Sequence, residues 1–457
     1  MSHSHAHGPI ELPRTQVRRV RIVLALITVP ILIATVVGMV FLWPTAARHE
    51  LRTPLLTPGA HFVSVQVTEV PGPAHPRQPV NVKAVAVAGV EQGQTVTVQV
   101  PPEVAGSGLA PGDRLRAIAL PDRIDPETGK SATHEQSVLF YYDHDRSIPL
   151  IVLAALYLLA VGLVARRRGL FAIVGLAAGV AIVIWFVLPA ILSGRPPLAV
   201  GLVGSVAMMF PAVYMAHGIS IRTTTALLGT FGGLGATVLL AALTAGPAGM
   251  TGAQGEAPPL LYGMDPTLGL QGILVTGVVL SGLGALNDVT ITQASAVWEL
   301  RAAMPSAPRR KVFAAAMRIG RDHIASTVYT LAFAYIGTAM PILLIASTID
   351  RSLFETLGAG EIAEEIFRTL VASIGLILAI PLTTGIGALL ASISPVDHSL
   401  PDTKAKTLAS ADPSGPDHPD PNHSDHDHAA TPMPDSRTAP APTVRRTGVR
   451  GRRRRQK

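Results

Sequence analysis

The stretch LFAIVGLAAGVAIVIWFVLPAIL, residues Leu170–Leu192, contains no charged residue. A helix needs about 20 predominantly apolar residues to cross the hydrocarbon core of a bilayer, so this stretch is long enough to span a membrane. In the whole chain of 457 residues, 48% are hydrophobic and only 15% are charged. That composition leaves too little polar surface for a soluble globule of this size, and it therefore predicts a membrane protein.

Seven other segments have the length and composition of a membrane span. The eight expected spans are Ile22–Trp43, Ile148–Ala165, Leu170–Leu192, Leu198–Met215, Thr225–Ala245, Leu268–Leu286, Ile324–Thr348 and Ile366–Ile393. They predict an α-helical polytopic membrane bundle of about eight transmembrane helices. The first span follows a basic leader, but its apolar run exceeds the roughly 7 to 15 residues of a signal-peptide core, which favours an uncleaved anchor.

The placement of charge predicts the orientation, because basic residues near span ends mark the cytoplasmic side. They gather before the first span, after the second and fourth, and between the sixth and seventh, at Arg14, Arg18, Arg19, Arg21, Arg166, Arg167, Arg168, Arg222, Arg301, Arg309, Arg310, Lys311, Arg318 and Arg321. If all eight segments cross, these positions fall on one side. Both termini are then expected in the cytoplasm.

The order of apolar and polar regions predicts five parts. They are a His-rich cytoplasmic segment 1–21, an anchor helix 22–43, an extracytoplasmic β-rich domain 44–147, a seven-helix membrane domain 148–393 and a His- and Arg-rich cytoplasmic tail 394–457. The tail lacks the apolar surface that offsets the entropy of ordering a chain, so we expect it to be disordered.

The β-rich domain shows apolar and polar residues in alternation, as half-buried strands do. Candidate strands lie at about 63–68, 80–87, 95–100, 115–120 and 138–142. Five strands predict a small barrel or sandwich between the first two helices, and since the chain has no cysteine the domain must fold without a disulfide. The following run Asp143-His-Asp-Arg146 indicates a solvated cluster beside the membrane rather than a metal site.

Histidines cluster at both ends of the chain, and histidine is a common metal ligand. The weak metal-ligand candidates are His3, His5, His7, His423, His426 and His428. They lack the fixed spacing of a structural zinc site, so plain polar sequence is favoured over chelation, and no cofactor is expected. The basic end Arg452–Arg455 indicates a solvated tail or contact with anionic lipid, and no nucleic acid partner is expected.

A polar segment lies between the sixth and seventh spans. Residues four, three and four apart fall on one helix face, as Asp288, Thr292, Ser295 and Glu299 do. The next span begins with Arg321-Asp-His323 at the same predicted boundary. Charges inside a membrane are expensive unless paired, so we expect Asp288 to pair with this cluster. The candidate substrate or ion pathway residues are Asp288, Thr292, Gln293, Ser295, Glu299, Arg321, Asp322 and His323. The alternative is that they are ordinary helix caps and membrane anchors.

Small residues and prolines suggest how the spans pack. Small residues four positions apart let helices approach closely, and the pairs are Gly175 with Gly179, Gly201 with Ser205, Gly229 with Gly233, and Gly277 with Ser281. Pro341 and the run Pro381-Leu-Thr-Thr-Gly385 are candidate kinks or breaks in the seventh and eighth spans. Transporters use such breaks to free backbone groups for substrates.

Several motifs resemble one known family. They are Leu286-Asn-Asp-Val-Thr-Ile-Thr-Gln-Ala-Ser-Ala-Val-Trp-Glu-Leu300, Met317-Arg-Ile-Gly-Arg-Asp-His323, Glu361-Ile-Ala-Glu-Glu-Ile-Phe-Arg368, Ser373-Ile-Gly and Ile380-Pro-Leu-Thr. Together they resemble the bacterial YibE/F family over roughly residues 148–393. The resemblance implies a multi-pass protein of the bacterial plasma membrane with transport as a candidate activity. It supplies no substrate and no mapped functional residue.

Two functions remain open from the sequence. One is a secondary transporter or permease for a small molecule or ion, and the other is a membrane-anchored envelope binding or assembly protein that acts through its β-rich domain. An enzyme is not expected, because the chain has no His-Glu-x-x-His zinc motif, no Gly-x-Ser-x-Gly nucleophile and no phosphate-binding Gly-x-x-x-x-Gly-Lys loop. The substrate and the oligomeric state do not follow from the sequence.

Overall fold

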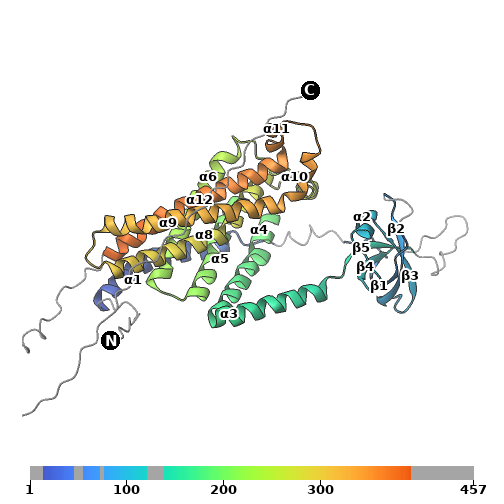
Figure 1. Cartoon of the computed structure of the whole chain (residues 1–457), viewed down its shortest axis with the longest axis horizontal. Coiled ribbons are helices and arrows are strands. Elements are labelled where there is room, and N and C mark those ends of the chain that lie inside the picture. The colour runs from blue at the N-terminus through green and yellow to red at the C-terminus, as the bar shows by residue number, and fades with distance from the viewer. Residues whose placement is uncertain (1–13, 46–54, 73–76, 121–137, 393–457) are drawn as a thin grey trace, which may run out of the picture. The chain divides into compact units, whose positions relative to one another are not determined.

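The computed structural model describes residues 14–45, 55–72, 77–120 and 138–392 (Figure 1). This part of the chain is mostly helical and contains one small β-domain. The candidate metal ligands at both termini and the tail 394–457 lie outside the described residues.

The β-domain is a closed five-stranded barrel. Its strands are β1 (His61–Glu69), β2 (Val80–Ala88), β3 (Thr95–Val100), β4 (Arg114–Ala119) and β5 (Val138–His144), in the order β1-β2-β3-β5-β4. All pairs are antiparallel except β3 with β5, and the short helix α2 (Pro102–Gly106) connects β3 to β4. The alternating residues Val63, Val65 and Val67 point into the barrel and are buried. Of the two predicted alternatives, the barrel is therefore confirmed.

Helices make up the rest of the described chain. They are α1 (Arg14–Phe41), α3 (Ser147–Ile182), which continues through the π-helical turn η3 (Val183–Val187) into α4 (Leu188–Leu192), α5 (Pro197–His217), α6 (Ile221–Ala245), α7 (Ala257–Met264), α8 (Leu270–Ala303), α9 (Arg309–Thr338), α10 (Met340–Ser347), α11 (Leu353–Leu357) and α12 (Gly360–Ser392). Large apolar side chains cover much of the surface of these helices, for example Leu26, Ile151 and Leu239. Such a surface is expected of a membrane-embedded protein.

The described chain has six helices that are long and apolar enough to cross a membrane, or seven if α9 and α10 form one bent span. α9 and α10 meet at Ala339, directly before Met340-Pro341, with a bend of 65°, which confirms the interruption predicted near Pro341. By contrast, α12 continues through Pro381, so the eighth span is not broken there, and a kink at this proline stays a prediction. Eight crossings stay a prediction.

The continuous helical run Ser147–Leu192 has 46 residues, more than twice what one crossing needs. Arg166 interrupts it with φ 52° and ψ −139°, which no helix residue adopts. Figure 1 shows α3 as two arms that meet at a sharp bend. The second and third predicted spans lie on either side of this break.

The centre of the helical domain is formed by α6, α8 and α12, each of which packs extensively against the other two. Its apolar core includes Leu227, Leu234, Leu286, Leu376 and Ile380. Several of the predicted small residues lie where helices approach closely, both inside this centre and where α5 meets α8. A Cβ atom at Gly233 would collide with Ala379 of α12, and one at Gly201 with Thr276 of α8, so larger residues would separate the helices.

Candidate functional site

The predicted polar stripe of α8 is mainly exposed. The side chains of Asp288, Thr292 and Glu299 are exposed, and that of Ser295 is half-buried. The hydroxyl of Thr292 donates a hydrogen bond to the backbone carbonyl of Asp288 (2.9 Å). Glu299 lies 3.8 Å from Arg222, and both side chains are exposed. Ion pairs of this kind contribute little to stability, so the stripe does not form a closed site by itself.

Asp288 does not pair with the cluster at the start of the seventh predicted span. Among the described residues, no hydrogen bond or ion pair joins Asp288 to Arg321, Asp322 or His323, and the first two of these are exposed. This corrects the sequence expectation. The physical reason is the packing of α9, which faces its neighbours with small and apolar residues, namely Val312, Ala315, Ala316 and Gly320.

Asp288 has a different neighbour. Both Asp288 and Arg168 are close enough to the imidazole of His217 to interact with it electrostatically. His217 ends α5, and Arg168 follows the break in α3. An acid of α8 and a cation of α3 therefore lie within electrostatic range of the histidine that ends α5, although no hydrogen bond or ion pair joins the three among the described residues.

Gln293 is the buried member of the predicted set, with only 3% of its surface exposed. Its amide nitrogen donates to the carbonyl of Ala316 in α9 (3.0 Å) and to the hydroxyl of Thr384 in α12 (2.7 Å). A Cβ atom at Gly320 would lie 3.1 Å from the amide oxygen of Gln293, so the glycine lets α9 approach this side chain. One amide thus joins α8, α9 and α12.

Threonine hydroxyls extend this polar contact to α6. The hydroxyls of Thr230 in α6 and Thr290 in α8 are hydrogen-bonded to each other at 2.7 Å. Thr383 contacts Gly229 of α6, where a Cβ atom would collide with it. We call Thr230, Thr290, Gln293, Thr383 and Thr384 the polar layer. Each is 3% exposed or less, so the layer is enclosed by the three central helices.

A second buried polar group lies at the beginning of α12. Glu364 is 9% exposed, and its carboxylate accepts a hydrogen bond from the backbone N–H of Gly252 (3.0 Å). One turn later, the Nε of Arg368 lies 3.6 Å from the carboxylate of Glu365. A Cβ atom at Gly277 of α8 would lie 3.4 Å from the guanidinium, so this glycine gives Arg368 room. We call Glu364, Glu365 and Arg368 the Glu364 cluster.

Sequence reasoning missed the Glu364 cluster as a site. The run Glu361–Arg368 contributed only to the family resemblance, and the predicted start of the eighth span at Ile366 divides it. One feature of the sequence could have indicated this cluster. Glu364 and Arg368 are four residues apart where an apolar helix begins, a spacing at which opposite charges share a helix face.

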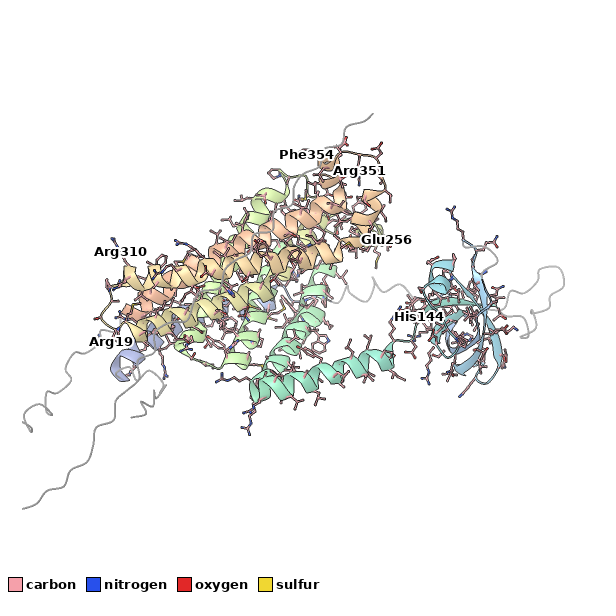
Figure 2. The ribbon with its side chains drawn as sticks, viewed as in Figure 1. Arg19, His144, Glu256, Arg310, Arg351 and Phe354 are labelled. Atoms are coloured by element: carbon pink, nitrogen blue, oxygen red, sulfur yellow. The ribbon has the colours of Figure 1, made fainter. Side chains whose placement is uncertain are left out.

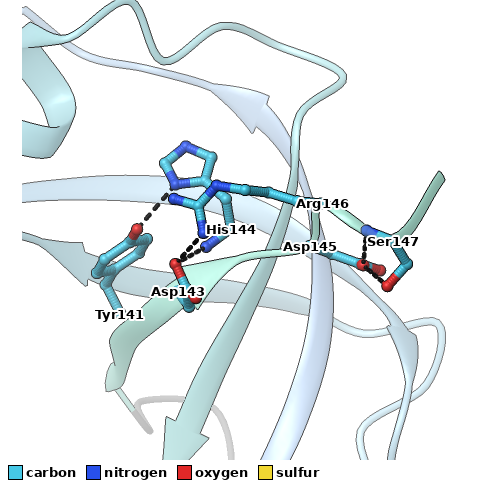
Figure 3. A network of polar contacts seen from close by, with 6 residues as sticks. All are labelled: Tyr141, Asp143, His144, Asp145, Arg146 and Ser147. Atoms are coloured by element: carbon cyan, nitrogen blue, oxygen red, sulfur yellow. Dashed lines mark hydrogen bonds and ion pairs between the residues drawn. The ribbon is translucent and has the colours of Figure 1, made fainter. Parts of the chain in front are cut away.

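The barrel carries its own polar network, drawn in Figure 3. One carboxylate oxygen of Asp143 accepts hydrogen bonds from the guanidinium of Arg146 (2.6 Å) and from the backbone N–H of His144 (2.8 Å). The bond from Arg146 holds the pKa of Asp143 below its usual value. Asp145 accepts from the hydroxyl of Ser147 (2.6 Å) at the beginning of α3. Asp143 and Arg146 are exposed, as a solvated cluster should be.

A cavity of about 450 Å³ lies beside this network, and its lining includes Arg116, Tyr142 and Arg146. The guanidinium of Arg116 stacks over the ring of Phe62 at 4.4 Å. In the described part of the chain, no three His, Asp or Glu side chains are grouped as ligands for a metal ion. The lining of this cavity thus combines basic and aromatic side chains with the carboxylates of Asp143 and Asp145.

Comparison with known families identifies the helical domain. The sequence model of the YibE/F-like protein family matches residues 153–393, more than half of the chain. The chain belongs to the YibE/F-like family. No curated protein and no solved structure matches it.

The region matched to the YibE/F-like family contains both the whole polar layer and the whole Glu364 cluster. Helix α1 and the barrel lie outside it. The shared part of YibE/F-like proteins is thus the membrane domain, and a function that belongs to the family is to be sought there.

Proposed function

We propose that this YibE/F-like protein is a secondary transporter or permease for a small polar molecule or an ion. The observation that carries the proposal is the buried amide of Gln293, which bonds to α9 and α12 inside an apolar helical bundle. Polar side chains are expensive inside a membrane and tend to occur on substrate and ion pathways. The competing explanation is structural, since interhelical hydrogen bonds also hold membrane helices together.

The Glu364 cluster supports the same proposal from the other part of α12. A carboxylate that is 9% exposed and receives one backbone hydrogen bond is a group that can exchange a proton or bind a cation. Along α12, Glu364 comes first, and Thr383 and Thr384 of the polar layer follow about five turns later. Helix α12 therefore contributes residues to both the Glu364 cluster and the polar layer, the two candidate sites along a transport pathway.

The proposed topology has eight crossings with both termini in the cytoplasm of a bacterium. Its support is the break at Arg166, which divides Ser147–Leu192 into two arms, and the arrangement of charge. Figure 2 draws Arg19 and Arg310 toward one end of the helical domain, and Glu256 and Arg351 toward the other. Reporter fusions test it, because phosphatase activity of a fusion at Ser306 contradicts the proposed side of the α8–α9 connection.

An inverted repeat of three-helix units is a common transporter plan, and here it would relate the third to fifth predicted spans to the sixth to eighth. The helix contacts give it little support. In the second unit α8 packs extensively against α12, whereas the described residues of α3 make no comparable contact with α6 in the first. The transport proposal therefore rests on the polar layer and not on symmetry.

The experiment is solute flux into proteoliposomes from a panel of ions and metabolites, with a pH-sensitive dye inside. Gln293→Met keeps the side-chain volume and removes both hydrogen bonds, so we expect flux to fall at least about tenfold. Gln271→Met makes the same change at an exposed position of the same helix and should leave flux unchanged. Undiminished flux through Gln293→Met contradicts a role for the polar layer.

The second candidate is a membrane-anchored protein that recognises an envelope component through its barrel. The observation in its favour is the barrel cavity with Arg116, Tyr142 and Arg146 in its lining. The two functions separate in cells. Deletion of residues 48–147 abolishes the activity of a barrel-dependent anchor, which should tolerate Gln293→Met, whereas a transporter fails with Gln293→Met. We propose a non-enzymatic role in either case.

A further inference from the structure

A cavity of about 640 Å³ lies between α1, α5 and α6. We call it the α1 cavity. Its walls are mainly apolar and include Leu24, Val29 and Leu32 of α1 and Phe210 of α5. It is separate from the polar layer and from the Glu364 cluster, because it shares no residue with either.

The α1 cavity has a charged end and an apolar end. Arg21 lies in its wall eleven residues before Leu32, and at 1.5 Å per residue this separation along the helix is about 16 Å. Between them, Thr28 is 8% exposed, and its hydroxyl has no hydrogen-bond partner among the described atoms. Tyr214 and Thr224, whose hydroxyls are 3.2 Å apart, also line the cavity. A ligand that fits must be amphiphilic.

With 17% of its most apolar stretch buried, helix α1 is less enclosed than the five other continuous helical segments that are long and apolar enough to cross a membrane in the described chain. Exposed apolar residues such as Leu26 and Ile33 cover the rest of its surface. The helix therefore lies at the lipid-facing side of the domain, where lipid is the most abundant amphiphile available.

We propose that the α1 cavity binds an anionic phospholipid. Its acyl chain lies along Val29, Leu32 and Phe210, and its phosphate is held by Arg21. Guanidinium groups recognise phosphate oxygens with two parallel charge-assisted hydrogen bonds. In a zwitterionic headgroup, the cation of the headgroup itself neutralises the phosphate charge and so weakens the attraction to Arg21. The proposal does not depend on transport, because it concerns a different set of residues.

The neighbouring arginines provide a matched control. Arg18 and Arg19 are exposed on the same helix, within one turn of Arg21, but neither lines the cavity. General attraction between a basic helix end and an anionic membrane would use all three arginines alike. A defined site uses Arg21 far more than Arg19.

The test is native mass spectrometry of the full chain with phosphatidylglycerol, phosphatidylcholine of the same acyl chains, or glycerol 3-phosphate, which lacks acyl chains. We expect phosphatidylglycerol to bind at least about fivefold more tightly than the other two. Arg21→Gln should weaken its binding about fivefold, and Arg19→Gln less than about twofold. Unchanged phosphatidylcholine binding and helical circular dichroism show that Arg21→Gln remains folded.

A second pair of variants tests the cavity itself. Ala25 lines the cavity and is exposed to it, so Ala25→Phe should fill the space and weaken phosphatidylglycerol binding about tenfold. Ala34→Phe adds the same ring at an exposed position of α1 outside the cavity and should have no effect. Equal binding of the two phospholipids, an equal loss in Arg19→Gln, or full binding in Ala25→Phe would each overturn the proposal.

Discussion

The barrel and the helical domain distribute polar and apolar side chains in opposite ways. The barrel core is a cluster of apolar residues such as Val82, Val98 and Leu139, and the buried carboxylate of the described barrel, Glu91, is paired with His61 at 2.8 Å. The helical domain encloses the hydroxyls and the amide of the polar layer and presents large apolar side chains such as Ile151 and Leu239 outward. Each arrangement suits the medium around that region, which is water for the barrel and lipid for the helical domain. Water drives apolar groups into the barrel, whereas in lipid close packing and interhelical hydrogen bonds hold helices together.

The comparison teaches that burial has a different meaning in the two regions. In the barrel a buried apolar residue contributes directly to stability, because it is removed from water. In the helical domain an apolar residue gains little from moving between lipid and protein interior, so the small residues that allow close approach matter more.

The strongest test concerns a helix contact made possible by a glycine. A Cβ atom at Gly229 would lie 2.8 Å from the Cβ of Thr383 and even closer to its hydroxyl. We expect Gly229→Val to force α6 and α12 apart and to lower stability in detergent by about 3 kcal/mol. Gly235→Val, in the same helix with open space around it, should have little effect. The midpoint of unfolding in a denaturing detergent measures both, and equal midpoints contradict the packing described here.

The second test replaces valine with threonine in the barrel and threonine with valine, which has the same shape, in the helical domain. Val82→Thr places a hydroxyl in the apolar barrel core and should lower the free energy of unfolding of residues 48–147, expressed alone, by about 2 kcal/mol. Thr230→Val removes the hydrogen bond to Thr290 and should lower the stability of the helical domain by only about 0.6 kcal/mol. Urea denaturation measures the first and detergent unfolding the second. A greater loss in Thr230→Val would reverse the comparison.

The fold was predictable where a single periodicity decides local structure. Alternation of apolar and polar residues located all five strands, and apolar length located the membrane helices. The positions at which helices bend or break were harder to predict. Pro341 predicted the bend between α9 and α10, but Pro381 lies inside a continuous helix, since neighbouring packing can accommodate proline in a membrane helix. The break at Arg166 was located by charge instead, because the run Arg166–Arg168 separates the second and third predicted spans.

The candidate site was less predictable than the fold. Charge directed attention to Asp288, which proved to be exposed and free of an ion pair with Arg321, whereas its neutral neighbour Gln293 joins three helices. Helical periodicity tells which residues share a face but not which face meets another helix. That choice depends on tertiary contacts such as Gly320 against Gln293 and Gly229 against Thr383, which pair residues far apart in sequence.

The smallest expected effect concerns the exposed network of the barrel. The pKa of Asp143 is lowered by its hydrogen bond with Arg146. A carboxyl whose pKa is lower in the folded state contributes stability above its unfolded pKa of about 3.9, and that contribution disappears as the pH falls through the folded pKa. Asp143→Asn should therefore lower the urea midpoint of residues 48–147 slightly at pH 7, and the difference from wild type should vanish near pH 2. Since both side chains are exposed, salt should weaken it as well. Arg146→Gln should produce the same loss, and the double variant no further loss. A difference that persists unchanged from pH 7 to pH 2 would show that Asp143 acts through its backbone contact with His144 and not through its charge, which would leave the outward-facing charges of the barrel without a measurable role in its stability.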